Sequence, residues 1–280
     1  MKLERPVWPE DRQCAAMISL NLNAELFWLE IDPDCADKPK TLSLGQYGMN
    51  RGLSRILDIL EERKIKATVF VPGRAADLYP EEIREIAARG HELGVMGYAD
   101  ENMAAYDTVA ENRESIRKSM QSLQRCTPAK IRGFRTPQND LTMETLRAAR
   151  ELGLDYSSNL CDDDRPYGID LGDGQTITEL PVHWVNYDLP YFAFNYHPAF
   201  PSGQGRIANY TAVLNNWMDE FDGCREYGLL YDLQLDPAMI GAPGRTVLLE
   251  ELLDHMIEAG GVWFATGSEL ADHYRDGQTA

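Results

Sequence analysis

Short apolar runs alternate with segments of helical periodicity along the whole chain, and this alternation limits the possible folds more than any other feature. The apolar run at 67–71 ends at Pro72-Gly73, and residues 53–63 before it carry apolar side chains at helical spacing. Alternating strands and helices are typical of a parallel α/β sheet. No break in composition and no internal repeat divides the 280 residues, so a single domain over 1–280 is predicted. The alternation alone does not decide between an open doubly wound sheet and a barrel.

The same periodicity predicts the positions of the strands and helices, and it predicts neither for one long stretch after the first strand. Strands are predicted at 15–20, 67–71, 91–96, 131–135, 176–182, 191–196, 228–235 and 261–265, with another opening at Tyr156. Helices are predicted at 53–63, 80–89, 109–124, 143–152, 212–227 and 246–259, with a last one after Ser268. Residues 26–48 contain Pro33, Pro39 and Gly45 and predict a long loop, of a length that is often functional or a lid.

The first strand stops abruptly in alternating polar residues. Residues 15–20 are apolar enough for a buried strand, and Asn21, Asn23 and Glu25 then follow two residues apart. Alternate side chains of an extended segment share a face. The carboxyl ends of parallel strands are where α/β folds bind their ligands. We therefore expect these three side chains to face a functional site together.

The charge balance excludes some partners. The net charge is −18 and the pI is near 4.6, which argues against nucleic acid and against an anionic membrane surface. The N-terminal residues 1–6 contain no apolar core of a secretory signal, and no stretch is long and apolar enough for a membrane span. The odd number of cysteines shows no metal-binding spacing and predicts reduced thiols in a cytoplasmic protein: Cys14, Cys35, Cys126, Cys161 and Cys224.

Several short motifs occur in the order found in one enzyme family. They are the polar strand end at 21–25, KATVFVPG at 66–73, GHELGVMGYADEN at 90–102, GFRTP at 133–137, ELPVHW at 179–184, LPYF at 189–192, DPAMIG at 236–241 and VWFAT at 262–266. Together they resemble the polysaccharide deacetylases of the NodB-homology group. Within that group they resemble the branch of intracellular peptidoglycan-deacetylase-like, allantoinase-like and cyclic-imide-hydrolase-like proteins. The resemblance covers essentially the whole chain. It implies a distorted (β/α)7-type barrel with a site at the carboxyl ends of the strands.

The resemblance implies metal-assisted amide hydrolysis, but most of the residues for that reaction differ here. The family's general base falls at Asn21, its metal-binding Asp at Asn23, its two metal histidines at Met96 and Asp100, and its proton-donor His at Asp236. An amide is not a base at neutral pH, and a thioether suits soft ions rather than a hydrolytic zinc. We therefore expect a site without a metal ion or other cofactor.

The gained carboxylates supply the candidate catalytic groups. Asp236 and Asp100 are the candidate proton carriers, because carboxylates buried together shift each other's pKa. The alternative is that both are simply tolerated in an inactive site. Asn21 and Asn23 would donate hydrogen bonds to a carbonyl or oxyanion. Arg135 keeps its family motif and is expected either to bind a substrate carboxylate or to pair with Asp188, Asp236 or Glu25.

The remaining candidates are expected to line the substrate site. Glu25 is read either as a pocket carboxylate or as part of a surface ion pair, and Asp188 as a polar pocket residue. Tyr187 would be an aromatic wall or a phenolic donor. Trp28 and Tyr191 would line a substrate groove, with packing in the core as the alternative.

These residues lead to one main functional hypothesis and two alternatives. The main one is a metal-independent enzyme that acts on a small amide, imide, lactone or carbonyl compound by carboxylate acid–base chemistry. The first alternative is a catalytically silent protein of the same fold that binds a ligand or an active relative. The second is a carbohydrate N-deacetylase with atypical metal binding. A small-molecule ligand is the expected partner, and the resemblance implies a possible homo-oligomer.

Overall fold

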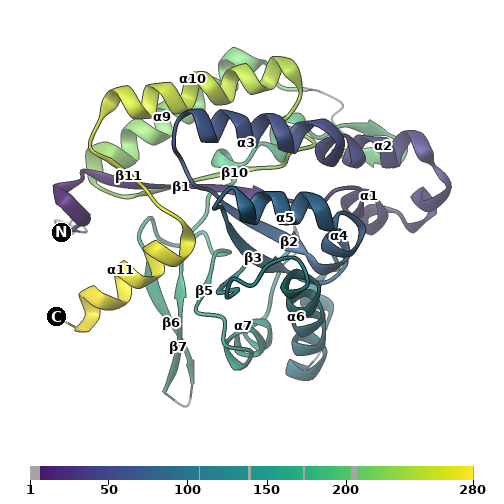
Figure 1. Ribbon diagram of the computed structural model, residues 1–280, viewed down its shortest axis with the longest axis horizontal. Helices are drawn as coiled ribbons and strands as arrows, with labels where there is room; N and C mark the ends of the chain where they lie inside the picture. The colour runs from purple at the N-terminus through teal and green to yellow at the C-terminus, as the bar shows by residue number, and fades with distance from the viewer. Residues whose placement is uncertain (1–6, 107, 138–139, 173, 203–206, 280) are drawn as a thin grey trace.

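The centre of the molecule is a mostly parallel sheet in which strands distant in sequence lie side by side (Figure 1). The computed structural model describes residues 7–106, 108–137, 140–172, 174–202 and 207–279. The strand order is β10-β1-β2-β3-β4-β5-β7-β6, and β11 also pairs with β1. All of these pairings are parallel except the β6–β7 hairpin. The predicted parallel α/β architecture is confirmed.

The strands are short, and most match the predicted positions. They are β1 (Cys14–Asn21), β2 (Thr68–Pro72), β3 (Glu92–Met96), β4 (Gly133–Phe134), β5 (Tyr156–Ser157), β6 (Tyr167–Gly172), β7 (Gln175–Glu179), β10 (Leu230–Leu235) and β11 (Val262–Phe264). A separate two-stranded sheet pairs β8 (Asn195–Tyr196) with β9 (Ala199–Phe200). Every residue of β1 and of β10 is buried, so both faces of these central strands are covered. In β10 the buried side chains include the polar residues Asp232 and Gln234.

Helices follow most of the parallel strands. The longer ones are α3 (Leu53–Glu62), α5 (Pro80–Ala88), α6 (Val109–Gln124), α7 (Met143–Glu151), α9 (Tyr210–Tyr227), α10 (Pro243–Ala259) and α11 (Gly267–Thr279). The shorter α4 (Gly73–Leu78) follows β2 directly. In Figure 1, α3, α9 and α10 run alongside one another next to β1 and β10. A capping box at Thr108 and Glu111 begins α6, and Gly228 in a left-handed conformation ends α9.

The sheet approaches a barrel without closing through a regular strand. Among the described residues no ladder joins β7 to β10. Instead, the chain after β7 runs across the gap, and Tyr187 forms an isolated parallel bridge with Gln234 of β10. The backbone N–H of Asp188 then donates to the carbonyl of Gln234 at 3.1 Å. The expected distorted barrel is therefore confirmed, with an irregular segment between β7 and β10.

Two predicted segments have a different conformation in the structure. The predicted loop at 26–48 is largely helical, with α1 (Leu26–Ile31), a 3-10 turn (Pro33–Asp37) and α2 (Pro39–Tyr47). Its prolines stand at the first turns of helical segments, where the fixed φ of proline is compatible with a helix. The predicted strand at 191–196 is instead α8 (Leu189–Phe192) followed by β8. Within the described residues, no helix is long and apolar enough to cross a membrane.

Candidate active site

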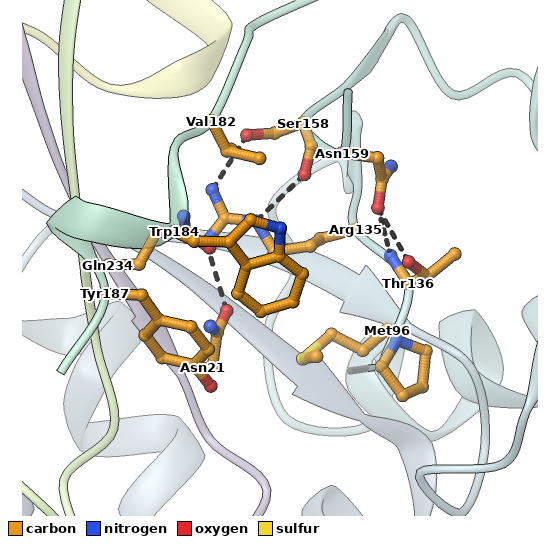
Figure 2. Close-up of a pocket in the computed structure, with 11 residues that line it drawn as sticks. Asn21, Met96, Arg135, Thr136, Ser158, Asn159, Val182, Trp184, Tyr187 and Gln234 are labelled. Carbon is orange, nitrogen blue, oxygen red and sulfur yellow. Dashed lines mark hydrogen bonds between the residues drawn. The ribbon is translucent and has the colours of Figure 1, made fainter. Parts of the chain in front are cut away.

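Polar side chains from several strand ends meet at one edge of the sheet. Asn21 is the last residue of β1 and Met96 the last of β3, while Arg135 directly follows β4 and Asp236 directly follows β10. These neighbouring parallel strands bring their carboxyl ends to the same edge. Figure 2 shows Asn21, Met96 and Arg135 around one cavity at that edge. The structure thus brings together the residues that the sequence analysis selected from four separate segments.

Arg135 is bound through every N–H group of its guanidinium. Its Nε donates to the carbonyl oxygen of Ser158 at 3.0 Å, and its Nη1 donates to Ser19 Oγ at 2.9 Å and Asn21 Oδ1 at 3.0 Å. Its Nη2 donates to Ser158 Oγ at 2.7 Å and Asp232 Oδ2 at 2.8 Å. An arginine side chain has five donors, and all are engaged here. Arg135 therefore holds the inner wall of the site and has no N–H group left for a substrate carboxylate.

The carboxylate that pairs with Arg135 is Asp232, in the middle of β10. The side chains of the pair are 4% and 1% exposed. Arg135 therefore does not pair with Asp188, Asp236 or Glu25, the three partners considered from the sequence. A buried ion pair is costly to break, since removing one partner leaves an uncompensated charge in the interior.

The bond from Arg135 orients the amide of Asn21. Since Asn21 Oδ1 accepts from Arg135, the Nδ2 group of the amide is turned away from the guanidinium as a donor. Tyr187 lines the same cavity, and Figure 2 shows its ring beside Asn21. Burial, followed by the charges of Asp236 and Asp188, raises the pKa of Tyr187, whereas the Asn21 side chain lowers it by hydrogen bonding. Tyr187 therefore carries a protonated hydroxyl at neutral pH.

Asp236 and Asp188 form a second buried unit beside β10. Asp188 accepts from the backbone N–H of Asp236 with both carboxylate oxygens at 3.0 Å, and from Ile240 at 3.0 Å. It thereby shapes the turn after β10. Asp236 accepts from the backbone N–H of Ala238 at 2.7 Å. Burial raises the pKa of Asp236 to about 7, so this carboxyl exchanges its proton near neutral pH.

Asp100 and Asn23 have polar atoms that find no partner among the described residues. Asp100 is 1% exposed, has a positive φ of 68°, and leaves its Oδ1 without a hydrogen bond. Burial, then the charges of Asp236, Glu101 and Glu30, raise the pKa of Asp100 well above its usual range. Asn23 is fully buried, and neither its Oδ1 nor its Nδ2 is bonded. Unsatisfied buried polar groups are rare in native proteins, so Asp100 and Asn23 are candidate ligand contacts.

Of the six expected substrate-binding residues, Tyr187 lines the cavity. The other five do not: Asn23, Asp188, Glu25, Trp28 and Tyr191. Glu25 accepts a hydrogen bond from the Tyr79 hydroxyl at 2.8 Å. Trp28 is 1% exposed and packs in an aromatic cluster, with ring centroids 4.8 Å from Phe27. The Tyr191 hydroxyl donates to a backbone carbonyl at 3.1 Å, and its ring packs on Trp217. The structure places the two aromatic residues in packing positions, the alternative that the sequence analysis left open for them.

The cavity itself is small. Its volume is about 80 Å³. Its walls combine polar and apolar side chains, namely Asn21, Met96, Arg135, Thr136, Pro137, Ser158, Asn159, Val182, Trp184, Tyr187 and Gln234. Trp184 is 59% exposed and lies in front of the other residues in Figure 2. A space of this size holds a few water molecules or one small functional group of a ligand.

The segment predicted as a loop holds the site by close backbone contact. A Cβ on Gly45 would lie 2.2 Å from the carbonyl oxygen of Ala24, and one on Gly52 would lie 2.0 Å from that of Pro237. Between them, a Cβ on Gly48 would lie 2.7 Å from the backbone N of residue 238. The helical stretch 45–52 therefore packs directly on both loops that follow β1 and β10.

Two residues of the site, Asp232 and Gln234, were not selected from the sequence, although an alternating pattern in the sequence marks them. Asp232 and Gln234 alternate with Leu233 and Leu235 along β10 and lead to Asp236. This is the same alternation that drew attention to Asn21 and Asn23 at the end of β1. Applied to β10, it would have placed Asp232 and Gln234 on the face that carries Asp236.

Comparison with known proteins settles the family. The profile of the polysaccharide deacetylase family matches residues 41–157. A crystal structure of a putative polysaccharide deacetylase from Mycobacterium smegmatis is 32% identical, covers 99% of this chain and 96% of its own, and superposes with a TM-score of 0.93. The chain belongs to the polysaccharide deacetylase family. The peptidoglycan deacetylase of Helicobacter pylori is 24% identical over 85% of this chain and 88% of its own. An allantoinase structure shares the fold at 23% identity and a TM-score of 0.84, covering 98% of this chain and 94% of its own.

This family member has an unusual set of donors where the motifs place the metal ligands. Asn23 offers an amide, Met96 a buried thioether and Asp100 a carboxyl. Within the described parts of the chain, no three His, Cys, Asp or Glu side chains gather closely enough to hold a metal ion. The histidine of the same segment, His91, accepts a hydrogen bond from the backbone N–H of Ala67 at 3.0 Å. Burial lowers the pKa of His91 to about 4, so its imidazole is neutral.

Proposed function

We propose that this polysaccharide deacetylase homologue acts on a small carbonyl compound, such as an amide, imide or lactone, without a catalytic metal ion. One observation carries the proposal. At the position of the family's general base stands Asn21, an amide whose oxygen is held by Arg135, so that its NH₂ group is turned toward the Tyr187 side of the cavity. A base has been replaced by an oriented hydrogen-bond donor. Such a donor suits a carbonyl oxygen on which negative charge develops.

The donor set argues against the family's zinc chemistry in this chain. Zinc in proteins takes thiolate, imidazole and carboxylate ligands, and catalytic sites use three of them. The three positions here supply a neutral amide, a thioether and one carboxyl, and this set does not fit zinc. We therefore derive no step through a metal ion.

The residues present support a hydrolysis by proton transfer alone. Asp236, as the carboxylate, takes a proton from water while the water oxygen bonds to the carbonyl carbon. Asn21 and Tyr187 hold the resulting oxyanion by hydrogen bonds. Asp236 then returns the proton to the leaving nitrogen or oxygen as its bond to the carbon breaks. A pKa of about 7 suits both halves of this exchange, since the group is easily deprotonated and reprotonated near neutral pH.

A catalytically silent, ligand-binding protein is the competing function. The saturation of Arg135 supports it, because this side chain is engaged in holding the fold and not in holding a substrate. Asp236 does not line the cavity, but its charge acts on Tyr187, which does. The two functions differ in whether Asp236 exchanges a proton with a group held beside Tyr187.

The experiment is a thermal-shift screen of small amides, cyclic imides and lactones in the presence of EDTA, followed by turnover assays on the compounds that bind. We expect turnover that survives EDTA and falls at least about a hundredfold in Asp236→Asn. Asp219→Asn, which removes an exposed carboxylate on α9, is the matched control and keeps full turnover. Turnover that requires added zinc would refute the metal-independent mechanism. Binding without turnover of any compound would favour the silent protein.

A further inference from the structure

A second, larger hollow adjoins the cavity, and its described lining carries two carboxyl groups and no cation. Its volume is about 510 Å³, within the range of small-molecule sites. Phe27 of α1, Leu189 of α8 and Phe200 of β9 form apolar walls. Trp184 borders both this hollow and the cavity that contains Asn21 and Tyr187. We call this space the α1 hollow.

The polar groups of the α1 hollow are acidic. Asp100 lines it as a buried residue, and Glu30 of α1 lines it as an exposed one. The charges that act on Asp100 come from Asp236, Glu101 and Glu30, all of them acids, and no lysine or arginine is among them. Burial and these acidic neighbours raise the pKa of Asp100, so a cation bound beside it would stabilise its carboxylate form.

Asp100 also lacks the hydrogen bond that a buried carboxyl requires. Its side chain is 1% exposed, and Oδ1 has no partner in the described part of the chain. A buried polar atom left without a partner carries a desolvation cost, and a ligand that bonds to it removes that cost. Within the described residues, the base of the hollow thus offers neither a partner for Asp100 Oδ1 nor a positive charge.

We propose that the α1 hollow binds an organic amine, with its ammonium group at Asp100 and Glu30 and its apolar body between Phe27, Leu189 and Phe200. An ammonium ion supplies N–H donors and positive charge together, which neither an alcohol nor a carboxylate does. The exposed face of Trp184 adds a cation–π surface at the boundary with the cavity. The net charge of −18 favours cationic ligands over anionic ones.

The inference deepens the proposed function, because an amine held beside Trp184 leaves the rest of the molecule facing the cavity of Asn21 and Tyr187. The inference rests on the proposed function in one respect, namely that the α1 hollow and the cavity together bind one substrate. The substrate class is then an amine-bearing carbonyl compound. Binding of the amine itself is measurable without any turnover.

The test uses benzylamine, benzyl alcohol and benzoate as probes of equal size and different charge. We expect calorimetry on the full chain at pH 7.5 to give benzylamine an affinity about tenfold or more above that of benzyl alcohol, and benzoate no measurable binding. Asp100→Asn should lose that tenfold preference, and Glu30→Gln a smaller part of it. Asp219→Asn, the distant exposed acid, should bind benzylamine like the wild type.

Two results overturn the inference. One is equal binding of benzylamine and benzyl alcohol by the wild type, and the other is an unchanged preference in Asp100→Asn. If Asp100→Asn does not fold, Glu30→Gln decides, because this residue is exposed and its loss leaves the interior intact. Turnover of carbonyl compounds with no preference for an amine would overturn this inference and leave the proposed function standing. Amine binding without turnover of any amine-bearing carbonyl compound would overturn the proposed function and leave the amine site standing.

Discussion

Replacing Asp236 by Asn isolates the effect of one buried carboxyl on the stability of the protein. Asp236 is 3% exposed, and its hydrogen bond to the backbone of residue 238 uses an oxygen that Asn retains. The substitution therefore removes the titrating group while it preserves size and the main contact. Any change in the pH dependence of stability then reports the ionisation of Asp236.

The magnitude follows from the raised pKa. Burial raises the pKa of this carboxyl from 3.8 to about 7, a difference of roughly three pKa units. One unit corresponds to 1.36 kcal/mol, so the linkage is on the order of 4 kcal/mol. A group with a raised folded pKa gives its full stability below the unfolded pKa and loses it as pH rises through the folded value. The wild type should thus lose on the order of 4 kcal/mol between pH 4 and 7 through this group alone.

The assay is urea unfolding followed by tryptophan fluorescence at intervals between pH 4 and 8. We expect the free energies of unfolding of wild type and Asp236→Asn to be similar at pH 4. They should separate as pH rises, with the variant more stable at pH 8. Removing the charge also relieves Asp100 and Asp188, whose pKa values Asp236 raises, and this acts in the same direction.

The comparison cancels the titration of other groups. The lowered pKa of His91 makes the protein lose stability as pH falls. This loss is the same in wild type and variant, so it cancels in the comparison. Asp219→Asn is the control and should give a curve parallel to the wild type. Parallel curves for wild type and Asp236→Asn would refute the reasoning, because they would mean that Asp236 ionises in the folded protein as it does in the unfolded chain. The proposed proton carrier would then be lost as well.

Three further predictions concern the scaffold and the metal. Arg135→Met should lower the free energy of unfolding by about 3–5 kcal/mol, since it leaves Asp232 buried without its cation, and adding Asp232→Leu should restore much of the loss. Gly52→Ala should cost about 1–3 kcal/mol by the clash with the loop after β10, whereas Gly223→Ala on α9, where a Cβ meets open space, should be neutral or stabilising; equal effects would contradict the packing argument. Mass spectrometry of metals in protein purified without chelators should find zinc far below one ion per chain, and stoichiometric zinc would contradict the predicted metal-free site.

Part of the fold could be predicted because it depends on local patterns. The burial of β1 on both faces appears in the sequence as the apolar run at 15–20, and Gly228 and Pro237 bound β10. The 26–48 segment was predicted wrongly because Pro33, Pro39 and Gly45 usually mark loops. Here the prolines begin helical turns, and Gly45 sits inside α2 where the backbone of Ala24 approaches. That approach involves residues about twenty positions apart, and no local pattern encodes it.

The sequence by itself determined the family, the alternating architecture and the strand ends where the site lies, because periodicity and motif order are properties of neighbouring residues. Only the tertiary structure decided which side chains of the site bond to one another. Arg135 pairs with Asp232, 97 residues away, and its hydrogen bond to Asn21 Oδ1 leaves the Nδ2 group of Asn21 as the donor. The pKa of Asp236 and the unsatisfied oxygen of Asp100 likewise depend on burial by distant segments. The chemistry of the site depends on these long-range contacts, since hydrogen bonding and desolvation act between atoms that only the fold brings together.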